Sequence, residues 1–278
     1  MLIATWNVNS IRTRLSQVKD WLEEVQPDLL CLQETKVADQ SFPKTELEEN
    51  GFHVSFHGQK SYNGVALISR HILKDIRIGL SGELPNDSQA NHFGEQARVI
   101  SAILNDIRVV NLYVPNGSAV GSDKYTYKIE WLACLKRYLN EQAKRDEPLC
   151  VLGDFNIALE DRDIHNPKRL VGGIMASQAE RECLKDLLGE RLQDVFRLFE
   201  PDSDHWSWWD YRSGAWDRDR GWRIDHIYLC NELIRQANSC EIHKKMRGNI
   251  QPSDHAPVVV DLNWPPELEE DTEELFQY

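Results

Sequence analysis

Short apolar runs separated by polar breakers dominate the first third of the chain. The runs at 2–7 and 29–32 are typical of buried β-strands. Between them, apolar side chains recur at spacings of four and three, which predicts a helix carrying Ile11, Leu15, Val18, Leu22 and Val25. Further short strands are predicted at 53–58, 65–69 and 76–79, followed by a polar connection at 81–96.

The middle of the chain combines strands with two longer helices. Strands are predicted at 98–104 and 108–113, joined by a turn at Asn105-Asp106. A helix is predicted at 123–146, with Ile129, Leu132, Leu135 and Leu139 on its apolar face. The next strand is 149–154. After a long loop at 157–176, Ser177 and Glu180 form a capping box that opens a helix ending at Leu188.

The last third adds strands at 207–209, 223–229 and 256–260. Many strands with few helices, partly antiparallel, predict an α/β fold with two packed mixed β-sheets flanked by helices, a four-layer α/β sandwich. Since nothing before Pro265 looks like a linker, we expect one domain at 1–264 and a flexible acidic tail at 265–278.

Composition narrows the class of protein. Hydrophobic residues make up 41% and charged residues 28% of the chain, which is typical of a soluble globular protein. The sequence has no apolar run of about 18 residues and no secretory signal at its start. Its six cysteines form no CxxC pair. We therefore expect a cytoplasmic protein without disulfides or structural zinc, and a monomer because no exposed apolar helix face stands out.

The net charge of −13 argues at first against a nucleic-acid partner, because phosphate backbones attract basic surfaces. However, the tail holds six acidic residues and no basic one, and without it the net charge would be −7. Carboxylates gathered around a metal ion would also count toward the total without repelling a phosphate that the metal bridges. The charge weakens a DNA-binding hypothesis without excluding it.

Polar side chains mark the strand ends. At the end of the 149–154 strand Gly153 permits close backbone approach, and Asp154 and Asn156 project to the same side. Comparable residues end the other apolar runs: Asn7, Glu34, Tyr113, Asp225 and the pair Asp254-His255. An ordinary core needs no polar residue at each of these places, and loops at strand ends are where α/β folds carry their chemistry.

Each of these residues also has a structural interpretation when taken alone. Asn7 and Asn9 can be turn residues, and Glu34 with Lys36 can be a surface ion pair. The segment 253–255 can be a cap or loop, and Tyr113 can simply pack. The joint set favours a metal-dependent phosphodiesterase site over these separate interpretations.

Six motifs resemble those of exonuclease III-type apurinic/apyrimidinic endonucleases, members of the endonuclease/exonuclease/phosphatase superfamily. They occur in the family's order and span nearly the whole chain: Thr5-Trp6-Asn7-Val8-Asn9, Leu32-Gln33-Glu34-Thr35-Lys36, Tyr113-Val114-Pro115-Asn116-Gly117, Gly153-Asp154-Phe155-Asn156, Trp222-Arg223-Ile224-Asp225 and Ser253-Asp254-His255. The resemblance implies Mg²⁺-dependent cleavage 5′ to abasic sites in double-stranded DNA, with 3′→5′ exonuclease activity and repair of damaged 3′ ends.

The resemblance also implies a role for each residue. Asp154 would orient and deprotonate the attacking water, Asn156 and Tyr113 would donate hydrogen bonds to phosphoryl oxygens, and His255 would bind a nonbridging phosphate oxygen. Asp225 would fix the ring and tautomer of His255. Residue chemistry alone would let Asp154 and His255 exchange the part of base.

A hard divalent ion suits oxygen ligands, so the expected cofactor is Mg²⁺, or Mn²⁺ in its place. Glu34 is the first expected ligand with Asn7 beside it, and the resemblance implies Asp254 for a second ion. The full set of expected metal-site residues is Asn7, Glu34, Asp154, Asn156, Asp254 and His255.

Tryptophans and arginines crowd the stretch 206–223, and such a mixture suits a nucleic-acid strand with an unstacked position. In the resembling family this region forms the pocket for a base-less sugar, and the matching residues here are Trp208, Trp209, Trp222 and Ile224. Asn116 is an expected phosphate contact, and Arg98, Lys128 and Lys168-Arg169 are weaker candidates. Any single tryptophan can instead belong to the core.

Three functions are compatible with these features. The first is the DNA-repair phosphodiesterase just described. The second is a phosphodiesterase of the same superfamily acting on a small non-DNA phosphate ester, against which the motif at 222–225 argues. The third is a non-catalytic nucleic-acid-binding module, which would have no use for a carboxylate cluster facing phosphate without a metal.

Overall fold

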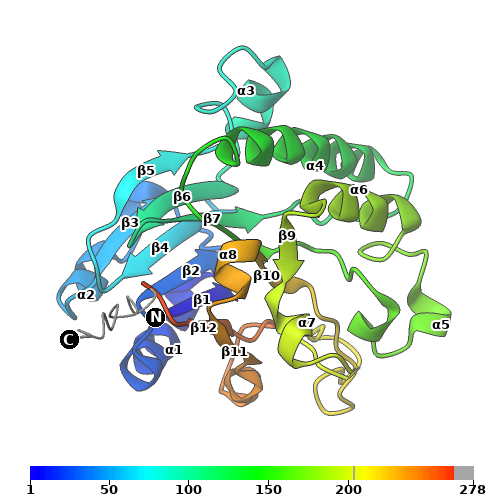
Figure 1. The fold of residues 1–278 in the computed structure, drawn as a ribbon. Helices are drawn as coiled ribbons and strands as arrows, with labels where there is room; N and C mark the ends of the chain where they lie inside the picture. Colours follow the sequence, from blue (N-terminus) through cyan, green and yellow to red (C-terminus); the bar gives the residue numbers. More distant parts are fainter. Residues whose placement is uncertain (203, 266–278) are drawn as a thin grey trace, which may run out of the picture.

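A computed structural model describes residues 1–202 and 204–265 (Figure 1). The acidic tail predicted at 265–278 therefore lies, apart from Pro265, outside the described residues. Along the described chain, none of the helices is long and apolar enough to cross a membrane. All six cysteines are free.

Two six-stranded sheets form the centre of the molecule. The first sheet has the order β11-β12-β1-β2-β4-β3, and its strands are β1 (Leu2–Asn7), β2 (Leu29–Gln33), β3 (His53–His57), β4 (Val65–Ser69), β11 (Ala237–Ile242) and β12 (Val258–Leu262). The second has the order β5-β6-β7-β8-β10-β9, and its strands are β5 (Lys74–Ile78), β6 (Val99–Leu104), β7 (Ile107–Tyr113), β8 (Leu149–Asp154), β9 (Leu192–Asp194) and β10 (Asp225–Cys230).

Each sheet is mixed in the same way. The pairs β1–β2 and β7–β8 at the two centres are parallel, and the other neighbouring strands are antiparallel. The two parallel pairs end at polar residues, because Asn7 closes β1 and Asp154 closes β8. Because the two sheets are built alike, the carboxyl ends of their central parallel strands lie at one shared edge.

Helices cover the two outer faces (Figure 1). The first sheet is covered by α1 (Ile11–Val25) and α2 (Lys44–Glu48), and the second by α4 (Asp123–Gln142) and α6 (Gln178–Leu188). Shorter helices are α3 (Ser88–Gly94), α5 (Pro167–Leu170), α7 (Val195–Phe199) and α8 (Asn231–Ile234), with 3₁₀ turns η1 (Asp39–Ser41), η2 (Asp161–Asp163) and η3 (Lys244–Gly248). The predicted four-layer sandwich of two packed mixed sheets flanked by helices is confirmed.

Strand alternation places the polar strand ends between the sheets. In β8, Cys150 and Leu152 belong to the core between the two sheets, whereas Val151 packs toward the α4 side. Asp154 continues the inward series of Cys150 and Leu152, because side chains two apart share a face. Asn7 continues the inward face of Ile3 in the same way.

Several short elements differ from the sequence-based expectation. The strand predicted at 207–209 is wrong: only Trp208 makes isolated bridges there, to Trp222 and His255, so the apolar run reflects indole packing and not a ladder. Edge strand β11 was not predicted, because its largely polar, partly exposed sequence lacks an apolar run. The elements α2, α3, β9, α7 and α8 were also missed, α4 ends at Gln142 instead of Asp146, and the loop predicted at 157–176 contains η2 and α5.

Gly153 is required by the close approach of β8 to β7. Its φ is 140°, and a Cβ built there would lie 2.0 Å from the carbonyl oxygen of Leu112, which is its register partner in β7. Any side chain would push the two central strands apart directly beside Asp154.

We predict that Gly153→Ala lowers the free energy of unfolding by about 3 kcal/mol or more, because steric overlap adds to backbone strain. Gly51→Ala is the matched control: Gly51 has a φ of 84°, but a Cβ there would meet nothing within 4 Å. Strain alone should cost the control about 1 kcal/mol. Urea unfolding of both variants measures the difference, and equal losses would contradict the strand-packing explanation.

Candidate active site

One edge of the two sheets collects the polar strand ends. From the first sheet come Asn7 at the end of β1, Glu34 just after β2, and Asp254 and His255 shortly before β12. From the second sheet come Tyr113 at the end of β7, Asp154 at the end of β8 and Asp225 at the start of β10. Because β12 and β10 run antiparallel to their neighbours β1 and β8, their beginnings reach the same edge as the ends of those neighbours.

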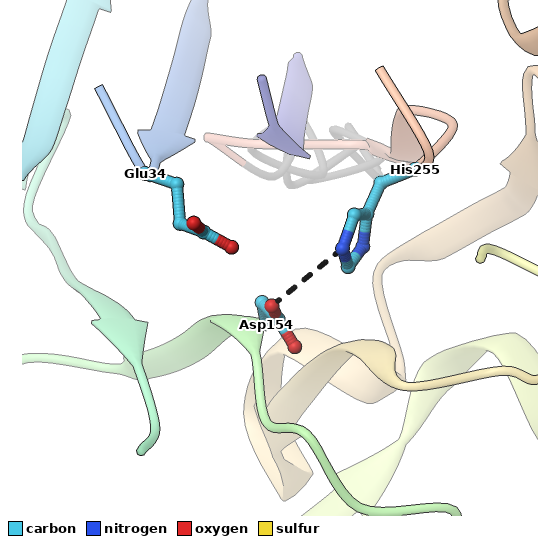
Figure 2. A group of neighbouring side chains, drawn as sticks. All are labelled: Glu34, Asp154 and His255. Carbon is cyan, nitrogen blue, oxygen red and sulfur yellow. Dashed lines mark ion pairs between the residues drawn. The ribbon is translucent and has the colours of Figure 1, made fainter. Parts of the chain in front are cut away.

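Glu34, Asp154 and His255 point toward one another (Figure 2). One ligand atom from each residue lies within 4.8 Å of the others. The fully buried Asn7 joins the two carboxylates, since its Nδ2 donates to Glu34 Oε1 at 2.9 Å and to Asp154 Oδ2 at 2.8 Å. A carboxylate from each sheet is therefore tied to the same amide.

Two site residues have left-handed backbone conformations. Glu34 and Asn156 both have φ of 49°, which costs a non-glycine residue about 1–2 kcal/mol, least for Asn. The turn at Glu34 is held by its carbonyl, which accepts from the backbone N–H of Ser10 at 2.8 Å. Strained backbone conformations persist only where surrounding interactions hold them, and they are found most often at functional sites.

His255 is held by Asp225. The Nδ1 of His255 lies 2.8 Å and 3.1 Å from the two oxygens of Asp225, and Ser207 donates its hydroxyl to Asp225 Oδ2 at 2.6 Å. Burial alone would lower the pKa of His255, but the carboxylates of Asp225 and Asp154 outweigh it and raise the pKa to about 10. At neutral pH the ring is therefore an imidazolium with both nitrogens protonated.

Asp154 faces the other side of the imidazolium, with its Oδ2 3.8 Å from His255 Nε2. Burial raises the pKa of Asp154 to about 7, and the carboxylates of Asp225 and Glu34 add to this effect against the attraction of His255. A carboxylate with a pKa near 7 is matched to accepting a proton at physiological pH.

Asn156 lies directly beside Asp154. Its backbone N–H donates to Asp154 Oδ1 at 2.9 Å, and its side-chain Nδ2 donates to Val114 O at 3.0 Å and to Asp154 Oδ2 at 3.2 Å. The exposed Asn116 donates its own Nδ2 to Asn156 Oδ1 at 3.0 Å. The two amides thus form a chain that leads from the surface to the buried carboxylate.

Tyr113 is covered by Arg98, whose guanidinium carbon lies 4.8 Å from the ring centroid. Burial, together with the negative charges of Glu34 and Asp154, raises the pKa of Tyr113 well above its ordinary value. The phenol therefore keeps its proton and can act as a hydrogen-bond donor.

Asp254 has partners of its own. Its two oxygens accept from Asn9 Nδ2 and Trp208 Nε1, each at 2.9 Å. Burial would raise the pKa of Asp254, but the positive charge of His255 and these donors lower it. Asp254 is not one of the three residues whose ligand atoms converge in the described structure, so its part in a second metal site stays a prediction.

The predicted sugar-pocket residues fall into two groups. Trp208, Trp222 and Ile224 belong to one apolar cluster beside the site, which also contains Met175. Trp209 packs in a separate cluster, is fully buried and donates its Nε1 to Asp219. In this structure Trp209 has no surface to offer a ligand, and its contact with DNA stays a prediction.

The donor set fits a hard divalent cation. Glu34 and Asp154 bring carboxylate oxygens close together, which are the ligands that such an ion prefers. His255 fits this role less well, because an imidazolium offers no lone pair. Glu34 also pairs with Lys36, whose Nζ lies 2.8 Å from Oε2, so the surface ion pair considered from the sequence does form.

Two important residues were missed or misplaced by sequence reasoning. Ser207, which supports Asp225, gave no signal, because its role depends on a contact across 18 positions. Lys128 was considered as a DNA contact, but its side chain is fully buried. The spacing of Lys128 with Leu132, Leu135 and Leu139 places it on the apolar face of α4 and could have revealed its burial.

Two mixed sheets that face each other and share an edge of carboxylates, amides and a paired imidazole define a class of phosphoester hydrolases. A family model described as "Endonuclease/Exonuclease/phosphatase family" matches residues 4–255, and the chain belongs to this family. The predicted family resemblance is confirmed.

Individual relatives cover almost the whole chain. Exodeoxyribonuclease III of Haemophilus influenzae is 36% identical in an alignment of 270 residues that covers 93% of this chain and 98% of the relative. A 3′ phosphatase from Neisseria, solved with a product DNA hairpin, superposes with a TM-score of 0.89 at 38% identity, covering 95% of this chain and 100% of the other. An AP endonuclease from Archaeoglobus fulgidus gives a TM-score of 0.87 at 37% identity, with 95% and 99% coverage.

We predict that Asp225→Asn lowers the pKa of His255 from about 10 toward or below its ordinary value of 6.5, because burial then meets less opposition. In the wild type the raised pKa stabilises the fold fully below pH 6.5, and this contribution is lost as pH rises through about 10. An NMR titration of the His255 ring measures the shift.

The control for this titration is Asp28→Asn, which removes the carboxylate beside the more exposed His71, at 2.6 Å from its Nε2. It should leave the titration of His255 unchanged. An unaltered His255 titration in Asp225→Asn would mean that Asp225 does not hold the imidazolium.

Proposed function

We propose that this protein is a DNA-repair phosphodiesterase that cleaves 5′ to abasic sites in duplex DNA and also processes 3′ ends. The observation that carries this proposal is the convergence of Glu34, Asp154 and an Asp225-paired His255 at one shared sheet edge. The family membership and the exodeoxyribonuclease III, 3′ phosphatase and AP endonuclease relatives support it.

The protonation states divide the roles between the two candidate bases. With a pKa of about 10, His255 is a donor at neutral pH and can hold a nonbridging phosphate oxygen. Asp154, with a pKa of about 7, can orient a water for in-line attack and accept its proton. The alternative in which His255 acts as the base would require it to lose a proton that two carboxylates retain.

Asn156 and Tyr113 would stabilise the charge that develops on the phosphoryl oxygens. Both N–H groups of the Asn156 amide have partners in the free protein, and the longer contact, 3.2 Å to Asp154, is the one that a phosphoryl oxygen would replace. Tyr113 reaches the same place from β7 with its proton retained.

Glu34 would hold Mg²⁺, or Mn²⁺ in its place. Asn7 would join it by turning its amide, because in the free protein its Nδ2 faces the carboxylates and its Oδ1 accepts from the backbone N–H of Asn9 at 3.0 Å. Such an ion, when bound, neutralises negative charge on the phosphate and the leaving 3′-oxygen. Asp254 would contribute to a second ion if two take part.

Two hollows with basic residues in their walls would accommodate a DNA strand. One, of about 580 Å³, is lined by Lys36, Arg98 and Lys124 together with the exposed Tyr62. The other, of about 470 Å³, is lined by Arg169, Arg218 and Arg220. Local basic surfaces of this kind attract phosphates in spite of the negative net charge, and Tyr62 offers a stacking face.

Beside the site, the partly exposed Trp208 would contact a base-less sugar, and the buried Trp222 and Ile224 packed against it would shape the apolar wall. The proposed catalytic unit is 1–264, since the site uses residues from Asn7 to His255. A monomeric state and a cytoplasmic location remain predictions.

We predict that the wild type, with Mg²⁺ but not with EDTA, nicks a labelled duplex immediately 5′ of a tetrahydrofuran abasic analogue. Loss of the proton acceptor in Asp154→Asn should reduce the rate by about 10²–10⁴-fold. The exposed Asp20→Asn on α1 is the control and should cut at the wild-type rate.

Several outcomes decide against parts of this proposal. Cleavage of a small phosphodiester with no cleavage of either abasic or intact duplex would favour the small-substrate alternative. No cleavage of any phosphodiester would favour a nucleic-acid-binding module. Shortening of an intact duplex from its 3′ ends would establish the exonuclease activity separately.

A further inference from the structure

A buried ion pair lies directly behind the amide chain of the site. The Nζ of Lys128 on α4 is 2.5 Å from Glu180 Oε1 on α6, and both side chains are 0% exposed. Neither residue reaches the surface or the reacting groups, so neither can contact a DNA phosphate. Burying such a pair gives no clear gain in stability over apolar packing of the same volume.

The other partners of Lys128 are the two loops that carry the amides. Its Nζ donates to the backbone carbonyl of Asn156 at 2.8 Å and to that of Asn116 at 3.2 Å. An ammonium group has three donors, so these two carbonyls and Glu180 use all of them. Lys128 thereby joins the loop after β7 to the loop after β8 at the two residues whose side chains hydrogen-bond to each other.

Hydrogen bonds to both carboxylate oxygens hold Glu180 in place. Its Oε1 accepts from the backbone N–H of Met175 at 3.1 Å, and its Oε2 accepts from the N–H and hydroxyl of Ser177 at 3.0 and 2.7 Å. Tyr125 on α4 closes the arrangement, since its hydroxyl lies 2.6 Å from that of Ser177. A carboxylate with these partners has little freedom and holds the ammonium in one place.

We propose that Lys128, held by Glu180, is a positioning residue for phosphodiester cleavage. It sets the loops after β7 and β8 so that the amides of Asn116 and Asn156 meet the phosphoryl oxygen in the transition state. This inference rests on the proposed function. It differs from a purely structural role, because a change in the pair alters catalysis even where the fold keeps its stability.

The test uses the double variant Lys128→Met/Glu180→Gln, which removes both charges with little change in volume. Lys128→Met alone leaves a buried carboxylate unpaired and is expected to lower the melting temperature. The double variant should recover to within about 3 °C of the wild type, while kcat on the abasic duplex stays about 10–100-fold lower with little change in KM.

The matched control is Lys136→Met/Asp186→Asn. This pair joins the same two helices at 2.7 Å but lies at the surface, with side chains 38% and 66% exposed. It should cut the abasic duplex like the wild type. Wild-type kcat in the Lys128→Met/Glu180→Gln variant would overturn the inference.

A cycle with Asn156→Ala identifies the route of the effect. If Lys128 acts through Asn156, the double change should alter kcat less than about 2-fold in the Asn156→Ala background. A full additional loss there would contradict positioning through this amide.

Hydrogen exchange separates this inference from the proposed function. Backbone amides at 114, 116–118 and 154–158 should exchange at least about 10-fold faster in the double variant than in the surface control, because the two loops are no longer joined. Equal exchange would overturn the inference whether or not the wild type cuts DNA. Faster exchange with an inactive wild type would reject only the proposed function.

Discussion

The site depends on a buried amide contact between Gln33 and Asn111, which fixes the position of one sheet relative to the other. Gln33 at the end of β2 donates its Nε2 to Asn111 Oδ1 on β7 at 2.7 Å, and Asn111 donates back to the carbonyls of Leu32 and Ala66 at 3.0 and 3.1 Å. An apolar core tolerates small slips, but a buried amide left without partners costs about 1–3 kcal/mol. This directional contact lies one residue before Glu34 and two before Tyr113, so it fixes where the strand ends of the two sheets meet.

Burial at that edge gives the charged groups their properties. The carboxylates of Asp154 and Asp225 are buried there, the partly exposed Glu34 lies beside Asp154, and a single imidazole lies between Asp154 and Asp225. The imidazole is therefore held as a cation while the Asp154 carboxylate becomes a stronger base. A divalent cation would be attracted to this edge, because the negative charge of the carboxylates exceeds the positive charge of the single imidazolium.

The elements that could be predicted from the sequence are those whose burial produces a recognisable local pattern of apolar and polar residues. Strands buried on both faces, such as β2 and β8, are continuous apolar runs, and their polar ends could be recognised as candidate site residues. Elements stabilised mainly by distant neighbours left no such mark: β11 is a polar edge strand, and Trp208 only bridges to Trp222 and His255. Ser207 is recognisable only when β10 is folded beside it. For Lys128 two signals disagreed. Its charge suggested a surface position, whereas its spacing on the apolar face of α4 correctly indicated burial.

The most direct test of this account is the position of a bound metal. Crystals grown with Mn²⁺ should show an anomalous-scattering peak at the edge shared by the two sheets, within coordination distance of the Glu34 carboxylate. The peak should be lost in Glu34→Gln crystals grown under the same conditions. A peak elsewhere on the protein, or one that persists unchanged in Glu34→Gln, would contradict the claim that the converging strand ends build the metal site.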